Sequence, residues 1–158
     1  MVNKILFITL SNIGDVILTL TVLDYLRENF PESKITVMVG PRAKEIFENN
    51  PYIDRLIVYD KHSRLREKIK LFGELKKERF DIVIDLRNTL YGALLPARYR
   101  TSPFLFVPKH IRHMKDRNLY RLARALKVKY PLPKTNKKSF YFTVHDKDYV
   151  DSLLKKDG

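Results

Sequence analysis

The residues that decide the fold are Ser11-Asn12-Ile13-Gly14-Asp15, which stand between the apolar run 4–10 and the segment 16–20. The run before them is rich in β-formers and predicts a buried strand. The segment after them begins a helical apolar pattern: Val16, Leu20, Leu23, Leu26 and Phe30. A strand that passes into a helix through a short polar turn places the helix N-terminus at the carboxyl edge of a sheet. Ligands of α/β proteins bind at that edge, where free backbone N–H groups favour anions.

Asp15 and Gly14 each allow a structural and a functional interpretation. Aspartate is a favoured helix N-cap and also suits the first turn of a helix, so Asp15 can serve the helix alone. Gly14 can meet a need for positive φ or for close backbone approach. The turn is not a phosphate loop, because it has a single glycine and no lysine after it.

Composition limits the class of protein. The chain has 158 residues, of which 44% are hydrophobic, so one domain with a substantial core is expected. It contains no cysteine, which excludes disulfide frameworks, thiolate zinc sites and cysteine nucleophiles. Asn12, Gly14 and Asp15 interrupt the N-terminal apolar run, and no apolar stretch reaches the roughly 20 residues of a membrane span. We therefore expect a soluble cytoplasmic domain.

The net charge of +13 is distributed unevenly along the chain. Up to Asp60 there are six Lys and Arg against eight Asp and Glu. Between Asp85 and Asp146 there are fourteen Lys and Arg and a single acid, Asp116. This asymmetry indicates one face for an anionic partner, such as nucleic acid, phospholipid headgroups or a phosphorylated substrate, or else a solvated basic face.

The rest of the chain alternates between strand and helix patterns. Strands are expected at residues 34–39, 55–59, 81–86, 104–107 and 140–144, and helices near 43–47, 63–79, 89–97, 116–127 and 146–155. In the second of these helices Ser63 is a candidate cap, and Leu65, Ile69, Phe72 and Leu75 form the apolar stripe. The alternation predicts a Rossmann-like three-layer α/β/α fold with a mostly parallel sheet.

The opening segment 8–19 resembles that of the ADP-heptose:lipopolysaccharide heptosyltransferases, glycosyltransferase family 9, in which a strand is followed by S-x-I/M-G-D-V and a helix. The resemblance continues at Leu26-Arg27 with Phe30-Pro31, at residues 81–87 (DIVIDLR), and at 93–98 (ALLPAR). His113 followed by Asp116-Arg117 is similar to a further family element before a helix. The similar pieces occur in the family's order and spacing over most of residues 1–130.

The resemblance implies half of a two-domain GT-B enzyme. Residues 1–158 would form a single Rossmann-like acceptor-binding domain, without the C-terminal domain that binds the donor ADP-heptose, and the isolated chain would be inactive. Asp15 matches the aspartate taken as general base, which removes a proton from the attacking sugar hydroxyl in an inverting transfer. Ser11, Asn12 and Gly14 match the loop that shapes the catalytic cleft. No cofactor and no metal-binding residues are expected, since the sequence shows no metal-ligand cluster, and metal dependence stays open.

The basic half then acquires an expected partner, the lipopolysaccharide core and lipid A acceptor. The carboxylates of its Kdo sugars and the phosphates of its lipid A suit contacts with arginine and lysine. The candidate contacts are chosen by location and charge: Arg87, Arg98, Arg100, Lys109 and Arg112. His113 is a further candidate, although a single histidine near a helix start also has a structural interpretation. Excess positive charge also suits peripheral binding to the anionic inner face of the inner membrane.

Two alternatives remain open at this stage. A basic nucleic-acid-binding α/β domain is supported by charge, but the sequence lacks the recognition motifs of that class, so no nucleic acid is expected. A non-catalytic Rossmann-like binding module is the other alternative. Binding of ADP to the isolated chain would favour the module, and a steep salt dependence of nucleic-acid retention would favour the first.

Overall fold

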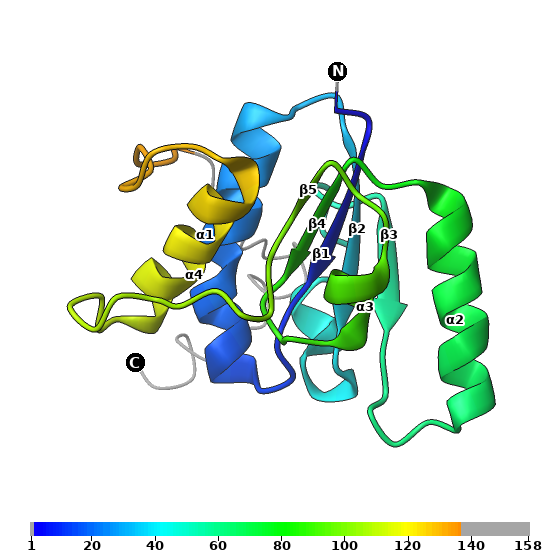
Figure 1. Cartoon of the computed structure of the whole chain (residues 1–158). Helices are drawn as coiled ribbons and strands as arrows, with labels where there is room; N and C mark the ends of the chain where they lie inside the picture. The colour runs from blue at the N-terminus through cyan, green and yellow to red at the C-terminus, as the bar shows by residue number, and fades with distance from the viewer. Residues whose placement is uncertain (1, 137–158) are drawn as a thin grey trace, which may run out of the picture.

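The computed structural model describes residues 2–136 and shows a sheet of five parallel strands between two layers of helices (Figure 1). The strands lie in the order β3-β2-β1-β4-β5, with β1 in the middle. Their bounds are β1 Lys4–Ile8, β2 Lys34–Val39, β3 Arg55–Val58, β4 Ile82–Asp85 and β5 Tyr99–Arg100. The helices are α1 Ile13–Asn29, the 3₁₀ helix η1 Pro41–Ile46, α2 Leu65–Glu78, α3 Leu90–Leu94 and α4 Met114–Leu126. The expected Rossmann-like architecture is confirmed.

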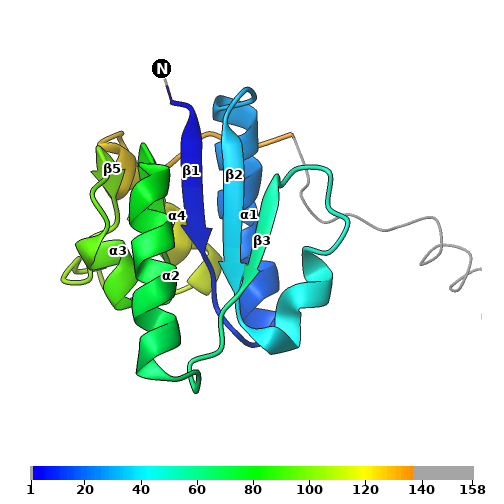
Figure 2. The same cartoon turned by 90° about the vertical axis from the view of Figure 1, so that its right-hand side faces the viewer.

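The central strand β1 is buried on both faces, which is typical of a parallel sheet covered by helices. Ile5 and Phe7 belong to a core shared with α1 and α4, whereas Leu6 and Ile8 belong to a second core shared with α2 and α3. All four side chains are fully buried, and each contributes about 1.5–3 kcal/mol of burial free energy. Figure 2 shows α2 in front of the sheet and α1 behind it.

The expected strand at residues 104–107 is wrong. The fifth strand is the two-residue β5, which pairs with Ile82 and Val83. Pro103 and Pro108 bracket the apolar run, and its residues alternate without a neighbouring strand: Phe104 and Phe106 are 93% and 71% exposed. The run begins in a turn, in which the Leu105 N–H donates to the Ser102 carbonyl, and it makes no ladder. Similarly, α3 ends at Leu94 rather than near Ala97, because Pro96 disfavours a helical conformation in the residue before it.

Helix α2 departs from its sequence pattern at its beginning. Ser63 is not its cap, since the Ser63 hydroxyl donates a hydrogen bond to the carbonyl of Asp60, and Arg64 occupies the N-cap position. Leu75 is buried as expected, but Leu65 and Ile69 are 72% and 62% exposed. Only the second half of the apolar stripe therefore packs on the sheet.

The strand expected at 140–144 and the helix expected at 146–155 lie outside the described residues. Within the described part of the chain, none of the helices has the length and apolar character needed to cross a membrane.

Candidate functional site

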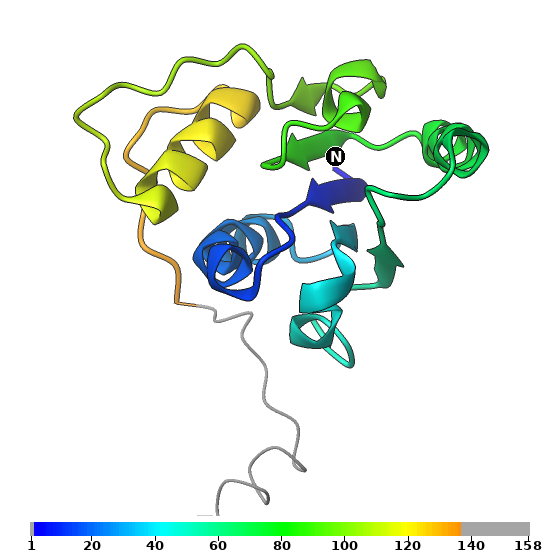
Figure 3. The same cartoon turned by 90° about the horizontal axis from the view of Figure 1, so that it is seen from below.

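The turn between β1 and α1 is fixed to the carboxyl edge of the sheet by buried hydrogen bonds. The Thr9 backbone N–H donates to Met38 of the neighbouring strand. The Thr19 hydroxyl donates to the Val16 carbonyl, so the Thr9 hydroxyl is the donor in the 2.7 Å bond between the two threonines. Both threonines are fully buried. They hold the start of α1 at one place on the sheet edge, which Figure 3 shows from below.

Asp15 is not the cap of α1. The N-cap residue is Asn12, whose side chain makes no capping hydrogen bond, and Asp15 lies in the first helical turn. The Asp15 carboxylate is half-buried and accepts a 3.3 Å hydrogen bond from the Asn12 amide. A first-turn carboxylate with this single hydrogen bond keeps accepting capacity for a further donor.

Gly14 has neither of the structural roles considered for it from the sequence. Its φ is not positive, and a Cβ at this position would meet no atom within 4 Å. Glycine costs about 0.5–1 kcal/mol relative to alanine inside a helix, so its presence next to Asp15 has no local structural reason. The space beside it is open.

Ser11 packs closely against Gly40, a glycine that the sequence pattern did not single out as a site residue. A Cβ on Gly40, which follows β2, would lie 2.6 Å from the Ser11 hydroxyl oxygen. Glycine is therefore required there for the turn after β1 to lie against the end of β2.

Asp85 organises the neighbouring loop and was also missed as a site residue. The residue is 3% exposed, and its carboxylate accepts hydrogen bonds from the backbone N–H groups of Arg87 and Thr89 and from the Thr89 hydroxyl. Burial raises the pKa of Asp85, and the hydrogen bonds from Thr89, Arg87 and Gly92 oppose that shift. A Cβ on Gly92 would lie 2.5 Å from the carboxylate. The fold thus builds α3 directly around Asp85.

The loop after β4 presents Arg87 at the same edge as Asp15. The Arg87 guanidinium lies over the Tyr59 ring, 5.2 Å from its centroid. Asn88 adopts positive φ, and its side-chain oxygen accepts a hydrogen bond from Arg121 of α4, which also donates to the Leu86 carbonyl. These contacts fix the loop from both of its sides.

Two hollows open along this edge of the sheet. One, of about 670 Å³, lies between α2 and α3 and is lined by Tyr59, Phe72 and Arg87 among others. The other, of about 250 Å³, lies between α4 and the segment 103–107 and is lined by Leu10 and Asn88 among others. Asn88 lines both hollows, whereas Asp15 lines neither of them.

Three predicted contacts lie in or beside the connection into α4. Lys109 and Arg112 are exposed in the connection, and His113 is the exposed N-cap residue of α4. The His113 side chain makes no capping hydrogen bond, whereas its carbonyl accepts the Arg117 N–H. The structure thus leaves all three side chains accessible.

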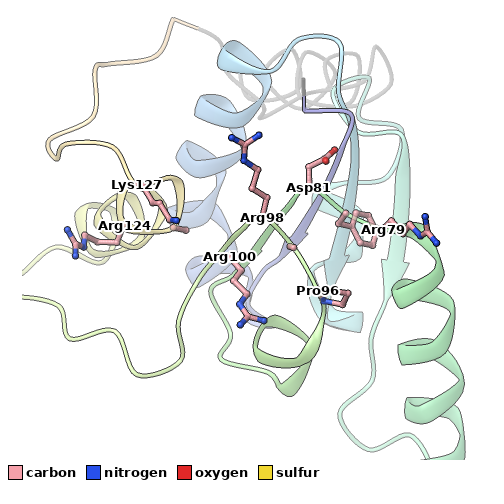
Figure 4. A pocket seen from close by; sticks show the side chains of 10 residues that line it. Arg79, Asp81, Pro96, Arg98, Arg100, Arg124 and Lys127 are labelled. Carbon is pink, nitrogen blue, oxygen red and sulfur yellow. The ribbon is translucent and has the colours of Figure 1, made fainter.

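Arg98 and Arg100 are not brought to the Asp15 edge. Arg98 precedes β5, and Arg100 pairs within it beside Val83, near the beginning of β4. The Arg100 guanidinium donates to the carbonyls of Ala93 and Leu95. Both arginines line a groove of about 910 Å³ at the amino edge of the sheet, where the basic side chains fan out in different directions (Figure 4). As contacts beside Asp15 these two candidates are therefore corrected: β5 runs parallel to β4, so residues at or before its beginning lie at the amino edge, opposite the edge that carries Asp15.

Among residues 2–136, no group of three or more His, Asp or Glu side chains lies close enough together to hold a metal ion. The arrangement at the carboxyl edge instead offers the accessible Asp15 carboxylate, several cations and open space. That set can accept a proton from a bound hydroxyl group and can hold an anionic ligand.

The fold and the turn at its carboxyl edge define a Rossmann-like α/β domain of the kind found in GT-B-like glycosyltransferases. The chain resembles a glycosyltransferase family 9 structure from Veillonella parvula with a TM-score of 0.72 and 25% identity, covering 99% of this chain and 49% of that one. It also shares its fold with the Escherichia coli ADP-heptose lipopolysaccharide heptosyltransferase II, with a TM-score of 0.66 and 19% identity over 96% of this chain and 50% of that one.

Sequence comparison points to the same group of proteins. The chain is 30% identical over 129 residues to the lipopolysaccharide heptosyltransferase 3 of Escherichia coli, covering 67% of this chain and 38% of that protein. It is 26% identical over 123 residues to the lipopolysaccharide core heptosyltransferase OpsX of Haemophilus influenzae, covering 70% of this chain and 35% of that protein. No protein-family profile matches the chain.

The chain is a relative of the lipopolysaccharide heptosyltransferases of glycosyltransferase family 9, as the resemblance of its motifs indicated. It spans little more than a third of the length of these curated relatives and about half of the similar solved chains.

Proposed function

We propose that this chain is the acceptor-binding, catalytic-base half of an inverting heptosyltransferase that transfers heptose from ADP-heptose to the lipopolysaccharide inner core. The observation that carries the proposal is the Asp15 carboxylate. It stands half-buried in the first turn of α1, free of a capping role and beside the open space at Gly14. The similarity to lipopolysaccharide heptosyltransferases supplies the class of reaction.

In the proposed reaction Asp15 accepts the proton of an acceptor sugar hydroxyl as that oxygen attacks the anomeric carbon of the donor. The bond from the anomeric carbon to the ADP oxygen breaks, and its electron pair leaves with ADP. Attack opposite the leaving group inverts the anomeric centre without a covalent enzyme intermediate. A carboxylate within hydrogen-bond reach of the hydroxyl typically contributes about 10²–10⁴-fold to such a step.

The cations at the same edge have a distinct proposed role. Arg87, Lys109 and Arg112 would bind carboxylate and phosphate groups of the acceptor, with His113 as a hydrogen-bonding partner. Arginine suits these groups because its planar guanidinium can bind two oxygens at once. Excess basic charge would also favour peripheral association with an anionic inner-membrane surface. The donor nucleotide would bind to the second domain of the complete enzyme.

The proposal is tested by following ADP release from ADP-heptose with a Kdo-bearing lipid A acceptor, using the complete reading frame that contains this chain. We expect Asp15→Asn to lower kcat by about 10²–10⁴-fold with acceptor affinity retained. Glu67→Gln is the matched control, since Glu67 is also a first-turn acid but receives the Arg64 backbone N–H and so serves its helix. Equal activity of wild type and Asp15→Asn would return Asp15 to a purely structural role.

A further inference from the structure

A partly apolar, partly basic surface lies where α2 begins, and no described segment covers it. Leu65 and Ile69, four residues apart on α2, are 72% and 62% exposed, and Leu94 of α3 is 60% exposed. These three side chains line the 670 Å³ groove together with Lys61, Lys68 and Arg87. We call these six residues the α2 patch. Aliphatic side chains exposed together in one groove indicate an interaction site rather than a solvated surface.

The charges around the α2 patch have one sign. Residues 61–70 contain five Lys and Arg and a single acid, Glu67. None of the patch cations takes part in the ion pairs found within residues 2–136. Lys68 donates its ammonium hydrogen bond to the carbonyl of Lys61, and Arg87 stacks on Tyr59. The cations therefore remain available for an anionic partner.

We propose that the α2 patch docks on an anionic lipid bilayer. Leu65, Ile69 and Leu94 would enter the boundary between headgroups and acyl chains, and the lysines would remain at the level of the lipid phosphates. The first turn of α2 lies at the same edge of the sheet as the first turn of α1, so docking brings Asp15 toward the bilayer (Figure 1). The inference deepens the proposed function and rests on it for a membrane-borne acceptor.

Two features of the molecule favour a bilayer over other occupants. A symmetric contact with a second copy of the chain would bring two strongly basic segments against each other, which is unfavourable. The basic groove at the amino edge has cations but none of the strongly exposed aliphatic side chains found on the α2 patch. Of these two basic surfaces within residues 2–136, the α2 patch is the one that combines exposed aliphatic side chains with positive charge in the manner of an interfacial helix.

The chain contains no tryptophan, so the variant Leu65→Trp reports from the α2 patch alone. The full chain is mixed with vesicles of phosphatidylglycerol and phosphatidylcholine. We expect a blue shift of emission and quenching by lipids brominated in the upper acyl chain. Val128→Trp is the matched control, because Val128 is a 42% exposed aliphatic residue just after α4, away from the patch. Its emission should not change.

Binding is measured separately by co-sedimentation with the same vesicles. We expect Leu65→Ser/Ile69→Ser and Lys61→Glu/Lys68→Glu each to lower the partition coefficient about tenfold or more. The control Lys34→Glu/Lys129→Glu reverses two exposed charges elsewhere and should lower it much less. Wild-type binding should weaken with salt and should be far lower on pure phosphatidylcholine.

Several outcomes overturn the inference. Failure of the wild type to sediment with anionic vesicles would contradict it, and so would patch variants that sediment as well as the wild type. If the chain self-associated and Leu65→Ser/Ile69→Ser abolished this, the α2 patch would be a contact with a second copy. If the rest of a longer chain shielded the Trp of Leu65→Trp from the lipid quencher, the patch would be a contact with that part of the chain. Transfer to a deacylated, water-soluble acceptor separates this inference from the proposed function: it should survive in the patch variants and fail in Asp15→Asn.

Discussion

Gly14 lies in the first turn of α1 in a conformation that any residue can adopt, with open space around it. We therefore predict that Gly14→Ala raises the free energy of unfolding by about 0.5 kcal/mol, because alanine loses less backbone entropy on folding. In the complete enzyme the same methyl group would stand beside the Asp15 carboxylate and lower transferase activity. Urea unfolding of the chain and the ADP-release assay measure the two effects.

Gly73 provides the matched control for that substitution. It lies in the interior of α2, its φ is not positive, and a Cβ there would also meet no atom within 4 Å. Gly73→Ala should stabilise the chain by about 0.5–1 kcal/mol and leave transfer unchanged. If Gly14→Ala were stabilising and fully active, the open space beside Asp15 would have no part in binding.

At the scale of elements, a carboxylate stands at each end of β4: Asp81 directly before the strand and Asp85 as its last residue. Their pKa values are shifted in opposite directions. Hydrogen bonds from the Asn3 and Lys4 backbone N–H groups lower the pKa of Asp81, which ties the start of β1 to β4. Burial raises the pKa of Asp85 at the other end. A lowered pKa stabilises the fold above the ordinary aspartate value of 3.8, and the stabilisation is lost as pH falls through the folded-state value. A raised pKa stabilises the fold below the ordinary aspartate value, and this stabilisation is lost as pH rises through the folded-state value.

These shifts predict distinct pH profiles for two variants. Asp81→Asn should lower the free energy of unfolding at neutral pH by about 1 kcal/mol, since its carboxylate is partly exposed, and the difference should shrink as the pH falls below about 3.8. Wild-type stability carries a contribution from Asp85 that declines as pH rises above that value, and Asp85→Asn should remove this decline. Urea unfolding between about pH 3 and pH 7 measures both profiles. If the free energy of unfolding of the two variants depended on pH in the same way, the opposite pKa shifts of Asp81 and Asp85 would be contradicted.

The elements also show how far the sequence predicts this fold. The strand, turn and helix around Asp15 follow from apolar periodicity, because their residues pack on one central sheet. The segment 104–107 has the composition of a strand, but a ladder needs a free neighbouring edge, which no local pattern reveals. The exposure of Leu65 is hidden for a related reason: an amphipathic pattern shows that a face seeks an apolar partner, not that the partner lies in the same chain.

The residues of the candidate site could likewise be predicted only where a local sequence pattern marks them. Asp15 and Gly14 are adjacent in sequence to the strand that positions them, so a motif captures them. Asp85, Gly40 and Arg121 act through contacts between distant segments and carry no local signal. Arg98 was grouped with the other cations by charge and by its position near a strand end, and neither says at which edge of the sheet it lies.

At the scale of the whole molecule, the chain corresponds to about half the length of the similar solved chains. The edge of the sheet that carries Asp15 also carries the proposed acceptor contacts and the α2 patch. If the donor nucleotide binds to the second half of a complete enzyme, residues 1–158 should show no saturable heat of binding with ADP in titration calorimetry. A water-soluble Kdo-bearing acceptor headgroup should bind, and Arg87→Ala should weaken that binding about tenfold through the loss of one charge-assisted contact.

Saturable ADP binding would instead favour a nucleotide-binding module. Retention on duplex DNA with a steep salt dependence, lost on charge reversal of Arg98 and Arg124 in the amino-edge groove, would favour nucleic acid as the partner.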